Sequence, residues 1–200
     1  MLQAGDQDQP RSPDEILAFR ASQGAFTELV SRYEDRIYRL AIRMCRNSAD
    51  AEEVCQETFR LAYGAMSSFQ GDSSIGTWLY RIATNEALMR RRAAARRPVG
   101  SIELIKESGG GWGDCTVGGE PVEGADELLH RKLLTQRVLG ALAQLDEPHR
   151  AALVLHDLEE RSADEAAEIL GISAGTLRQR AHRARVRLRA QLGVLQPPAP

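Results

Sequence analysis

Apolar residues recur at spacings of three and four along most of this chain, which is the period of one face of an α-helix. The clearest run contains Phe26, Leu29, Val30, Tyr33, Ile37, Leu40, Ala41 and Met44. The helical stretches do not show the alternation of apolar and polar residues that marks a half-buried strand. We therefore predict an all-α fold.

One stretch interrupts this period and divides the chain. Residues 98–125 contain Gly109-Gly110-Gly111, Gly118-Gly119 and Pro121, with little periodicity, which is typical of a flexible linker. The predicted organisation is a flexible leader at 1–13, a helical domain at 14–97, the linker at 98–125, a second helical domain at 126–192 and a flexible tail at 193–200. A flexible linker of this length would let the two domains lie about 30 Å apart.

The first domain is predicted to hold three helices. The first carries the apolar run above, and Ser48 is the expected N-cap of the second, with the Asp50 carboxylate near the positive end of the helix dipole. Residues 69–74 (FQGDSS) end the second helix. A third helix is expected from residue 75 to about 97, with Trp78 and Leu79 on its inner face.

The basic residues are concentrated in two places. The whole chain has 26 Lys and Arg against 28 Asp and Glu, so its net charge of −2 indicates nothing about a polyanionic partner. Residues 81–97, however, hold six arginines and one acid, and residues 178–189 hold six arginines and no acid. Two basic helices favour two contacts with a polyanion such as nucleic acid. The alternative is that both are ordinary solvated helix faces.

Enzymatic, metal and membrane functions find no support in the sequence. Cys45, Cys55 and Cys115 form no C-x-x-C pair, so neither a zinc site nor a disulfide framework is indicated. Phosphate-binding loops and hydrolase or metalloprotease motifs are absent, and we predict no catalytic residue and no cofactor. The chain has no run of 18 apolar residues and its first 13 residues are unlike a signal peptide, so we expect a cytoplasmic protein without membrane insertion.

The second domain contains a predicted helix-turn-helix between residues 162 and 192. Ser162 and Glu165 fit a capping box at the start of a short helix, and Gly171 stands where a left-handed residue would end it. Ser173 or Thr176 can cap the next helix. The inner stripe of that helix is Leu177, Ala181, Ala184 and Leu188. A short helix, a glycine turn and a second helix form the arrangement that places a recognition helix in the major groove.

The outer face of this second helix carries the hydrogen-bonding side chains. Arg178, Gln179, His182 and Arg183 project together from its N-terminal half. Arginine can bind the major-groove edge of guanine and glutamine that of adenine. The arginines further along, at 185, 187 and 189, suit phosphate contacts. The alternative is a helical hairpin with a basic exterior.

Both domains resemble those of one family. Residues 50–92 resemble conserved region two of the extracytoplasmic-function (ECF) sigma factors of bacterial RNA polymerase, and residues 145–188, including GTLRQRAHRAR, resemble their region four. The two stretches stand in the family's order and spacing. The resemblance implies a sigma factor that directs core polymerase to promoters and assists promoter melting. It also implies contacts with the −35 element by Thr176, Arg178, Gln179, His182 and Arg183.

The resemblance assigns the −10 element to the first domain. The loop from Phe69 to Ser74 resembles the family loop that captures a flipped base, and a hydroxyl-rich loop suits that task. Trp78 could stack on a base, but its place on an apolar stripe favours core packing. The implied contacts for −10 binding and melting are Phe69, Asp72, Ser73, Ser74, Trp78, Arg81, Asn85 and Arg90.

The resemblance also names protein partners. Glu53, Gln56 and Glu57 share one helix face, which would dock on the clamp helices of the polymerase β′ subunit, although such rows are usually only solvated. The other implied partners are the β flap, promoter DNA and an anti-sigma factor. Ala166 and Ala181 stand where the family usually has bulkier aliphatic residues, which shrinks the contact between the two helices of the turn.

A second interpretation is a conventional helix-turn-helix regulator whose first domain serves dimerisation or sensing. It explains the arginine-rich end of the first domain poorly. A palindromic site and a stable dimer would support it.

Overall fold

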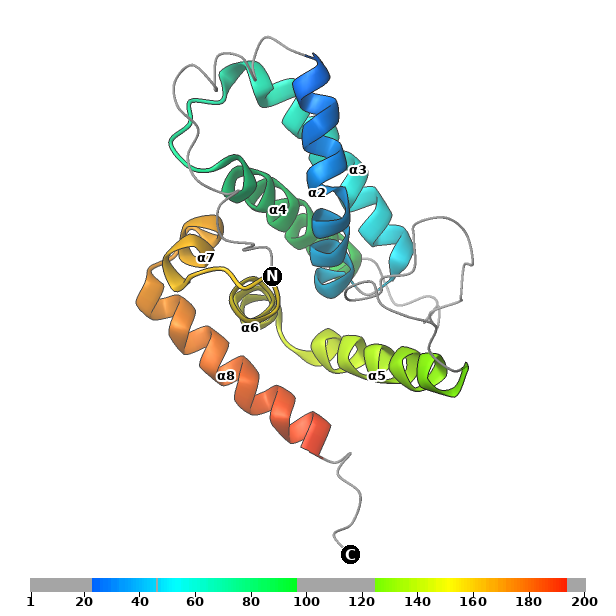
Figure 1. Cartoon of the computed structure of the whole chain (residues 1–200). Coiled ribbons are helices and arrows are strands. Elements are labelled where there is room, and N and C mark those ends of the chain that lie inside the picture. The colour runs from blue at the N-terminus through cyan, green and yellow to red at the C-terminus, as the bar shows by residue number, and fades with distance from the viewer. Residues whose placement is uncertain (1–22, 46, 97–124, 194–200) are drawn as a thin grey trace, which may run out of the picture.

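The computed structural model describes residues 23–45, 47–96 and 125–193, and Figure 1 shows their arrangement. All regular structure in these ranges is helical, as predicted. Residues 1–13, 98–124 and 194–200 of the predicted leader, linker and tail lie outside the described residues, and so does Cys115. Ala125 and Gly193, at the edges of the predicted linker and tail, are the first residue of α5 and the last of α8.

In residues 23–45 and 47–96, the described part of the N-terminal module contains three long helices and one short turn. They are α2 (Gln23–Met44), α3 (Ser48–Ala65), the 3₁₀ turn η1 (Met66–Ser68) and α4 (Ile75–Arg96). The three helices pack against one another, each along its apolar stripe. Ile37 and Leu40 of α2, Val54 of α3 and Leu79 of α4 are almost completely buried. The helical period in the sequence therefore marks the core of this module correctly.

The N-cap of α3 differs from the prediction. Asn47, not Ser48, precedes the helix in extended conformation, and its side-chain oxygen accepts the Asp50 backbone N–H at 2.7 Å. Ser48 is already the first helical residue. Asparagine and serine cap helices about equally well, so the path of the backbone decides which of these two neighbouring residues is the N-cap.

Ser74 is the capping residue of α4. Its hydroxyl accepts the Thr77 backbone N–H at 3.0 Å and donates to the Thr77 hydroxyl at the same distance. Gly71 in the preceding loop has φ of 81°, in the region that favours glycine. The loop thus reverses the chain between η1 and α4 and fixes where α4 begins.

The C-terminal module contains four α-helices and one π-helical segment. They are α5 (Ala125–Gln144), α6 (Glu147–Leu153), the π-helical η2 (Val154–Leu158), α7 (Ala163–Leu170) and α8 (Ala174–Gly193). The predicted capping box of α7 is confirmed, because Ser162 accepts the Glu165 N–H at 3.1 Å and the Glu165 carboxylate accepts the Ser162 N–H at 2.9 Å. The predicted left-handed end is confirmed at Gly171, with φ of 63°. Ser173 then caps α8 by accepting the Thr176 N–H.

The two modules pack against each other. In Figure 1, α7 lies beside α4, and α2 approaches α5 and η2. Arg150 of α6 is completely buried at this junction. Its guanidinium donates to the carbonyl of Met44, the last residue of α2, at 2.9 Å and to that of Leu145 at 3.1 Å. A cation therefore lies at the negative end of the α2 dipole, where it is stabilising.

Candidate nucleic-acid interface

The second helix of the helix-turn-helix presents its polar face to solvent. Leu177, Ala181 and Ala184 of α8 are completely buried, which fixes the helix against α6 and α7. The opposite face exposes four of the five predicted −35 contacts: Arg178, Gln179, His182 and Arg183. The fifth, Thr176, is half-buried, with its hydroxyl 2.8 Å from that of Ser173. The arrangement offers hydrogen-bond donors from one turn and a half of helix to a groove.

The arginines further along α8 are not equivalent to one another. Arg185 binds the Asp157 carboxylate through Nε at 2.6 Å and through a terminal nitrogen at 2.8 Å, and this hydrogen bonding raises the Arg185 pKa. Arg187 pairs with Asp146. Arg189 is exposed. Arg185 and Arg187 therefore connect α8 to the rest of its module, and a phosphate would have to share them with these carboxylates.

The loop predicted to capture a base is partly built into the core. Phe69 is 6% exposed, and its ring centroid lies 5.0 Å from that of Trp78, which is half-buried against the core. Ser74 is buried as the cap of α4. Asp72 is exposed and Ser73 half-buried, so these two are the predicted loop contacts that face solvent.

The remaining −10 candidates lie along α4. Asn85 is exposed, while Arg81 and Arg90 are half-buried and paired. Arg81 donates to Glu168 of α7 at 2.6 Å, and Arg90 pairs with Asp50 and Glu53 of α3. Arg81 and Asn85 are one turn apart and share a face. The structure therefore brings Arg81 and Asn85 together, whereas the Arg90 side chain points to the carboxylates of α3.

The predicted polymerase-binding row lies on α3. Glu53 and Gln56 are exposed, and Glu57 is half-buried. Arg60 donates through Nε to Glu57 at 2.7 Å, and this hydrogen bond holds the Glu57 pKa below its usual value. A hollow of about 250 Å³ opens beside the row between α2 and α3. It is lined by Glu34, Tyr38, Glu52, Cys55, Gln56 and Phe59.

The cysteines in the described part of the chain are small core residues, as predicted. Cys45 and Cys55 are 5% and 6% exposed. Burial raises the pKa of the Cys45 thiol to about 12 and that of Cys55 to about 11, so both stay protonated and unreactive near neutral pH. Within the described ranges, no group of His, Cys, Asp and Glu side chains could hold a metal ion. None of the helices described is long and apolar enough to cross a membrane.

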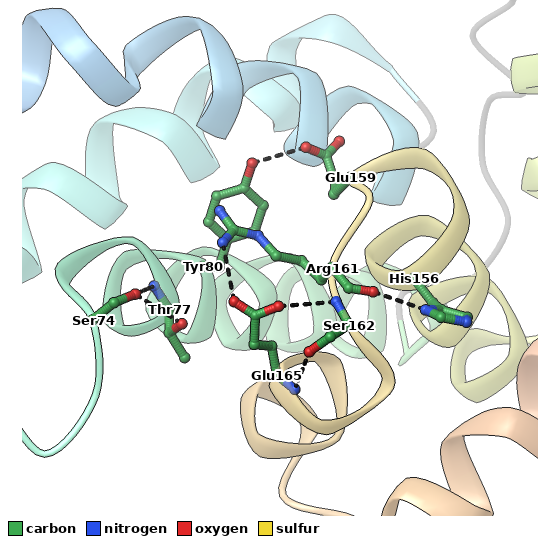
Figure 2. Close-up of polar contacts among 8 residues, drawn as sticks. All are labelled: Ser74, Thr77, Tyr80, His156, Glu159, Arg161, Ser162 and Glu165. Carbon is green, nitrogen blue, oxygen red and sulfur yellow. Dashed lines mark hydrogen bonds and ion pairs between the residues drawn. The ribbon is translucent and has the colours of Figure 1, made fainter. Parts of the chain in front are cut away.

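Sequence reasoning missed the residues that join the two modules. The side chains of Tyr80, Arg150, Glu159 and Arg161 are buried there, and Figure 2 shows Glu159 and Arg161 beside the Tyr80 ring. Tyr80 lies on the inner stripe of α4, and Glu159 comes shortly after the apolar run of residues 151–155. The sequence does show these polar residues within or shortly after an apolar run, which suggests that they are buried. Such a pattern does not identify the residue with which each one pairs.

Family models match both modules. The model described as Sigma-70 region 2 matches residues 29–97, and the model described as Sigma-70, region 4 matches residues 135–188. The chain is 37% identical over 180 residues to the ECF RNA polymerase sigma-E factor of Escherichia coli (strain K12), spanning 86% of this chain and 90% of that one. It is 34% identical over 175 residues to the RNA polymerase sigma-H factor of Pseudomonas aeruginosa, with the same two coverages.

Solved structures share the fold. CnrH in complex with the cytosolic domain of CnrY matches with a TM-score of 0.66 and 25% identity, over 90% of this chain and 96% of that one. The sigma factor RpoE from Bartonella quintana, solved in complex with the anti-sigma factor NepR, matches with a TM-score of 0.63 and 24% identity, over 86% of this chain and 98% of that one.

Proposed function

The chain belongs to the ECF group of the sigma-70 family of bacterial RNA polymerase sigma factors, and we propose that it selects promoters through the α8 face and the α4 surface described above. It is a transcription initiation factor and not an enzyme. The observation that carries the proposal is the exposed row on α8, in a helix-turn-helix whose caps and buried stripe are all formed. We assign core-polymerase and −10 binding to residues 14–97 and −35 binding to residues 126–192.

The −35 element is read by α8. Arg178 and Gln179 begin the exposed row, and their side chains fit guanine and adenine edges in the major groove. His182 and Arg183 follow one turn later and extend the contact, and Thr176 lies near the N-terminus of the helix, where hydroxyls and backbone N–H groups bind phosphate oxygens. These five residues are the proposed −35 site.

The −10 element is bound along α4 and its preceding loop. Asp72 and Ser73 face solvent and form the polar rim that receives a base. Phe69, Ser74 and Trp78 hold the loop in place from the side of the core. Arg81, Asn85 and Arg90 follow on α4 and contact the separated strand and its phosphates. Three residues of this set thus act by shaping the loop and five by direct contact.

Core polymerase docks on α3. Glu53, Gln56 and Glu57 form a polar row on that helix, and the 250 Å³ hollow beside them offers apolar surface for a partner side chain. We assign the β′ clamp helices to this face and the β flap to the C-terminal module. The protein acts in the cytoplasm, where polymerase and promoter DNA are found.

An anti-sigma factor controls the protein in this proposal. Two similar folds were solved with such a partner or with a cytosolic domain bound. A partner of this kind would cover the polymerase-binding face of α3 and hold the modules together. Isolation of the chain from cells only as free protein or holoenzyme, under all conditions, would contradict this part of the proposal.

Run-off transcription tests the function directly. Purified core polymerase is mixed with this protein and a library of upstream sequences, and we expect discrete starts that appear only when the protein is added. An α8 variant, Arg178→Ala with Gln179→Ala, should lose these starts, whereas the matched control Arg189→Ala should keep them with reduced salt tolerance. Specific duplex binding by the protein alone, without starts, would instead indicate a conventional regulator.

A further inference from the structure

Met89 is an exposed apolar side chain on α4, a helix whose other large apolar residues face inward. It is 53% exposed, whereas residues such as Leu79 and Leu88 are buried or packed against the core. Ala87, two residues before Met89, is completely buried. Because each residue turns a helix by about 100°, Met89 lies about 200° round from Ala87 and points away from the core. The packing of the fold therefore does not account for an apolar residue at this position.

The face of α4 that carries Met89 is the face of the proposed −10 contacts. Asn85 is exposed and precedes Met89 by four residues, so the two side chains are neighbours on the helix surface. The loop of residues 69–74 leads into the opposite end of α4, at Ile75 (Figure 1). Met89 thus lies on the side of Asn85 away from the loop proposed to receive a flipped base. At a rise of about 1.5 Å per residue, the step from Asn85 to Met89 is about 6 Å.

The surroundings of Met89 are basic. Residues 90–97 contain five arginines and no acidic residue. The Arg92 side chain is 60% exposed and pairs with Glu147, and Arg90 pairs with Asp50 and Glu53. Single exposed apolar side chains are common on protein surfaces. An apolar side chain next to a run of arginines, however, suits an apolar group carried by a polyanion better than the apolar surface of a protein.

DNA offers an apolar group at its base edges in the C5-methyl group of thymine. The methionine side chain is unbranched and has three rotatable bonds, so it can adapt its shape to such a group. Stacked bases are about 3.4 Å apart. The 6 Å step along α4 therefore places Met89 beside a base one or two positions from the base that Asn85 contacts.

We propose that Met89 is a specificity-determining contact for the −10 element, and that its side chain packs on the C5-methyl group of a thymine beside the base contacted by Asn85. This inference rests on the proposed function and adds to it a residue that reads the promoter by apolar contact rather than by hydrogen bonds. Uracil has the same hydrogen-bonding groups as thymine and lacks only the methyl group. The contact therefore discriminates between these two bases.

Replacement of thymine by uracil tests the contact at the level of one methyl group. Binding of the holoenzyme is measured on a promoter found by run-off transcription, with each thymine of the −10 element replaced in turn by uracil. For the wild type, we expect one of these replacements to weaken binding about two- to fivefold, because the burial of one methyl group is lost. In Met89→Ala the same replacement should have no effect, whereas Met89→Leu should retain the effect.

Leu133→Ala is the matched control, because Leu133 is an apolar residue of α5 that is 47% exposed and lies outside the proposed −10 surface. It should retain the full effect of uracil, and circular dichroism should show equal helix content in all variants. Equal uracil effects in the wild type and Met89→Ala, or no effect in the wild type, would overturn the inference. A loss of polymerase affinity in Met89→Ala that does not depend on the base would overturn it in favour of a protein contact. Absence of starts with the wild-type holoenzyme would overturn the proposed function, and this inference with it.

Discussion

Arg150 shows how one residue can be essential to the fold without any sequence motif. It is completely buried, and its guanidinium satisfies the carbonyls of Met44 and Leu145. A buried cation is tolerated only with such partners. Replacing it by methionine keeps much of the volume but leaves those carbonyls without this donor.

We expect Arg150→Met to lower the free energy of unfolding by about 2–4 kcal/mol, because each unsatisfied buried polar group costs about 1–3 kcal/mol. Urea denaturation followed by circular dichroism measures this loss. Arg189→Met, at an exposed position of α8, is the control and should change stability by no more than about 0.5 kcal/mol. Equal effects of the two substitutions would show that the Arg150 hydrogen bonds contribute little.

Arg178 and Arg189 are expected to differ in the kind of DNA contact they make. Arg178→Ala should weaken holoenzyme binding by about 1–3 kcal/mol at one −35 position and relax the base preference there, because a bidentate contact to guanine is lost. Arg189→Ala should weaken binding to all sequences alike and reduce the salt slope by about one. Binding to a set of single-base promoter variants distinguishes the two. A uniform loss in Arg178→Ala would make Arg178 a phosphate contact.

The local chemistry of individual residues was predictable where the signal is local. The Ser162 capping box and Gly171 involve bonds within four residues, and both were correctly predicted. The cap of α3 was wrong by one residue, because Asn47 and Ser48 are both good caps and only the path of the chain separates them. The pairings of Glu159 with Tyr80 and with Arg43 depend on residues that are distant in the sequence. For that reason they could not be inferred from spacing.

At the scale of the elements, the turn between α7 and α8 has the most demanding geometry. Gly171→Ala should destabilise the chain by about 1–2 kcal/mol, because a Cβ is unfavourable at φ of 63°. Gly175→Ala, four residues later in α8, is the matched control. An added Cβ there meets only the Ser173 hydroxyl, at 3.9 Å. That change should stabilise the chain by about 0.4–1 kcal/mol, because it restricts the unfolded state. Thermal melts of both variants test the pair, and destabilisation of similar size in both would contradict the argument.

Helix positions followed from periodicity, but the π-helical segment did not. The stripes of α2 and α8 repeat every three or four residues, so their buried faces could be assigned from sequence. Residues 154–158 (VLHDL) follow α6 directly and give no sign in the sequence of the wider turn. The small residues Ala166 and Ala181, which depart from the family pattern, are completely buried. Close helix packing accommodates them, and this depends on the partner helices rather than on either residue.

At the scale of the whole molecule, the sequence predicted two modules but not their contact. Charged residues such as Arg92, Glu147 and Glu168 resemble those of any solvated helix face, because a charge pattern does not identify a partner. The polar part of the contact rests mainly on buried groups, Tyr80 with Glu159 and Arg150 with the Met44 carbonyl, since exposed ion pairs contribute only about 0–1 kcal/mol each.

The covalent connection between the modules strengthens their contact. It holds them together at an effective concentration that separate molecules would reach only at about 1 mM, so a modest contact persists within one chain.

Cutting the chain between the modules tests this balance. A protease site placed at residues 109–111 allows the full chain to fold first and to be cleaved afterwards. After cleavage, the two modules should elute separately from a sizing column at about 1 µM and together near 1 mM, because cleavage replaces the effective concentration by the real one. The uncleaved protein is the control and should elute as one compact species at both concentrations. Co-elution of the fragments at 1 µM would mean that the modules bind each other too tightly for polymerase docking alone to separate them.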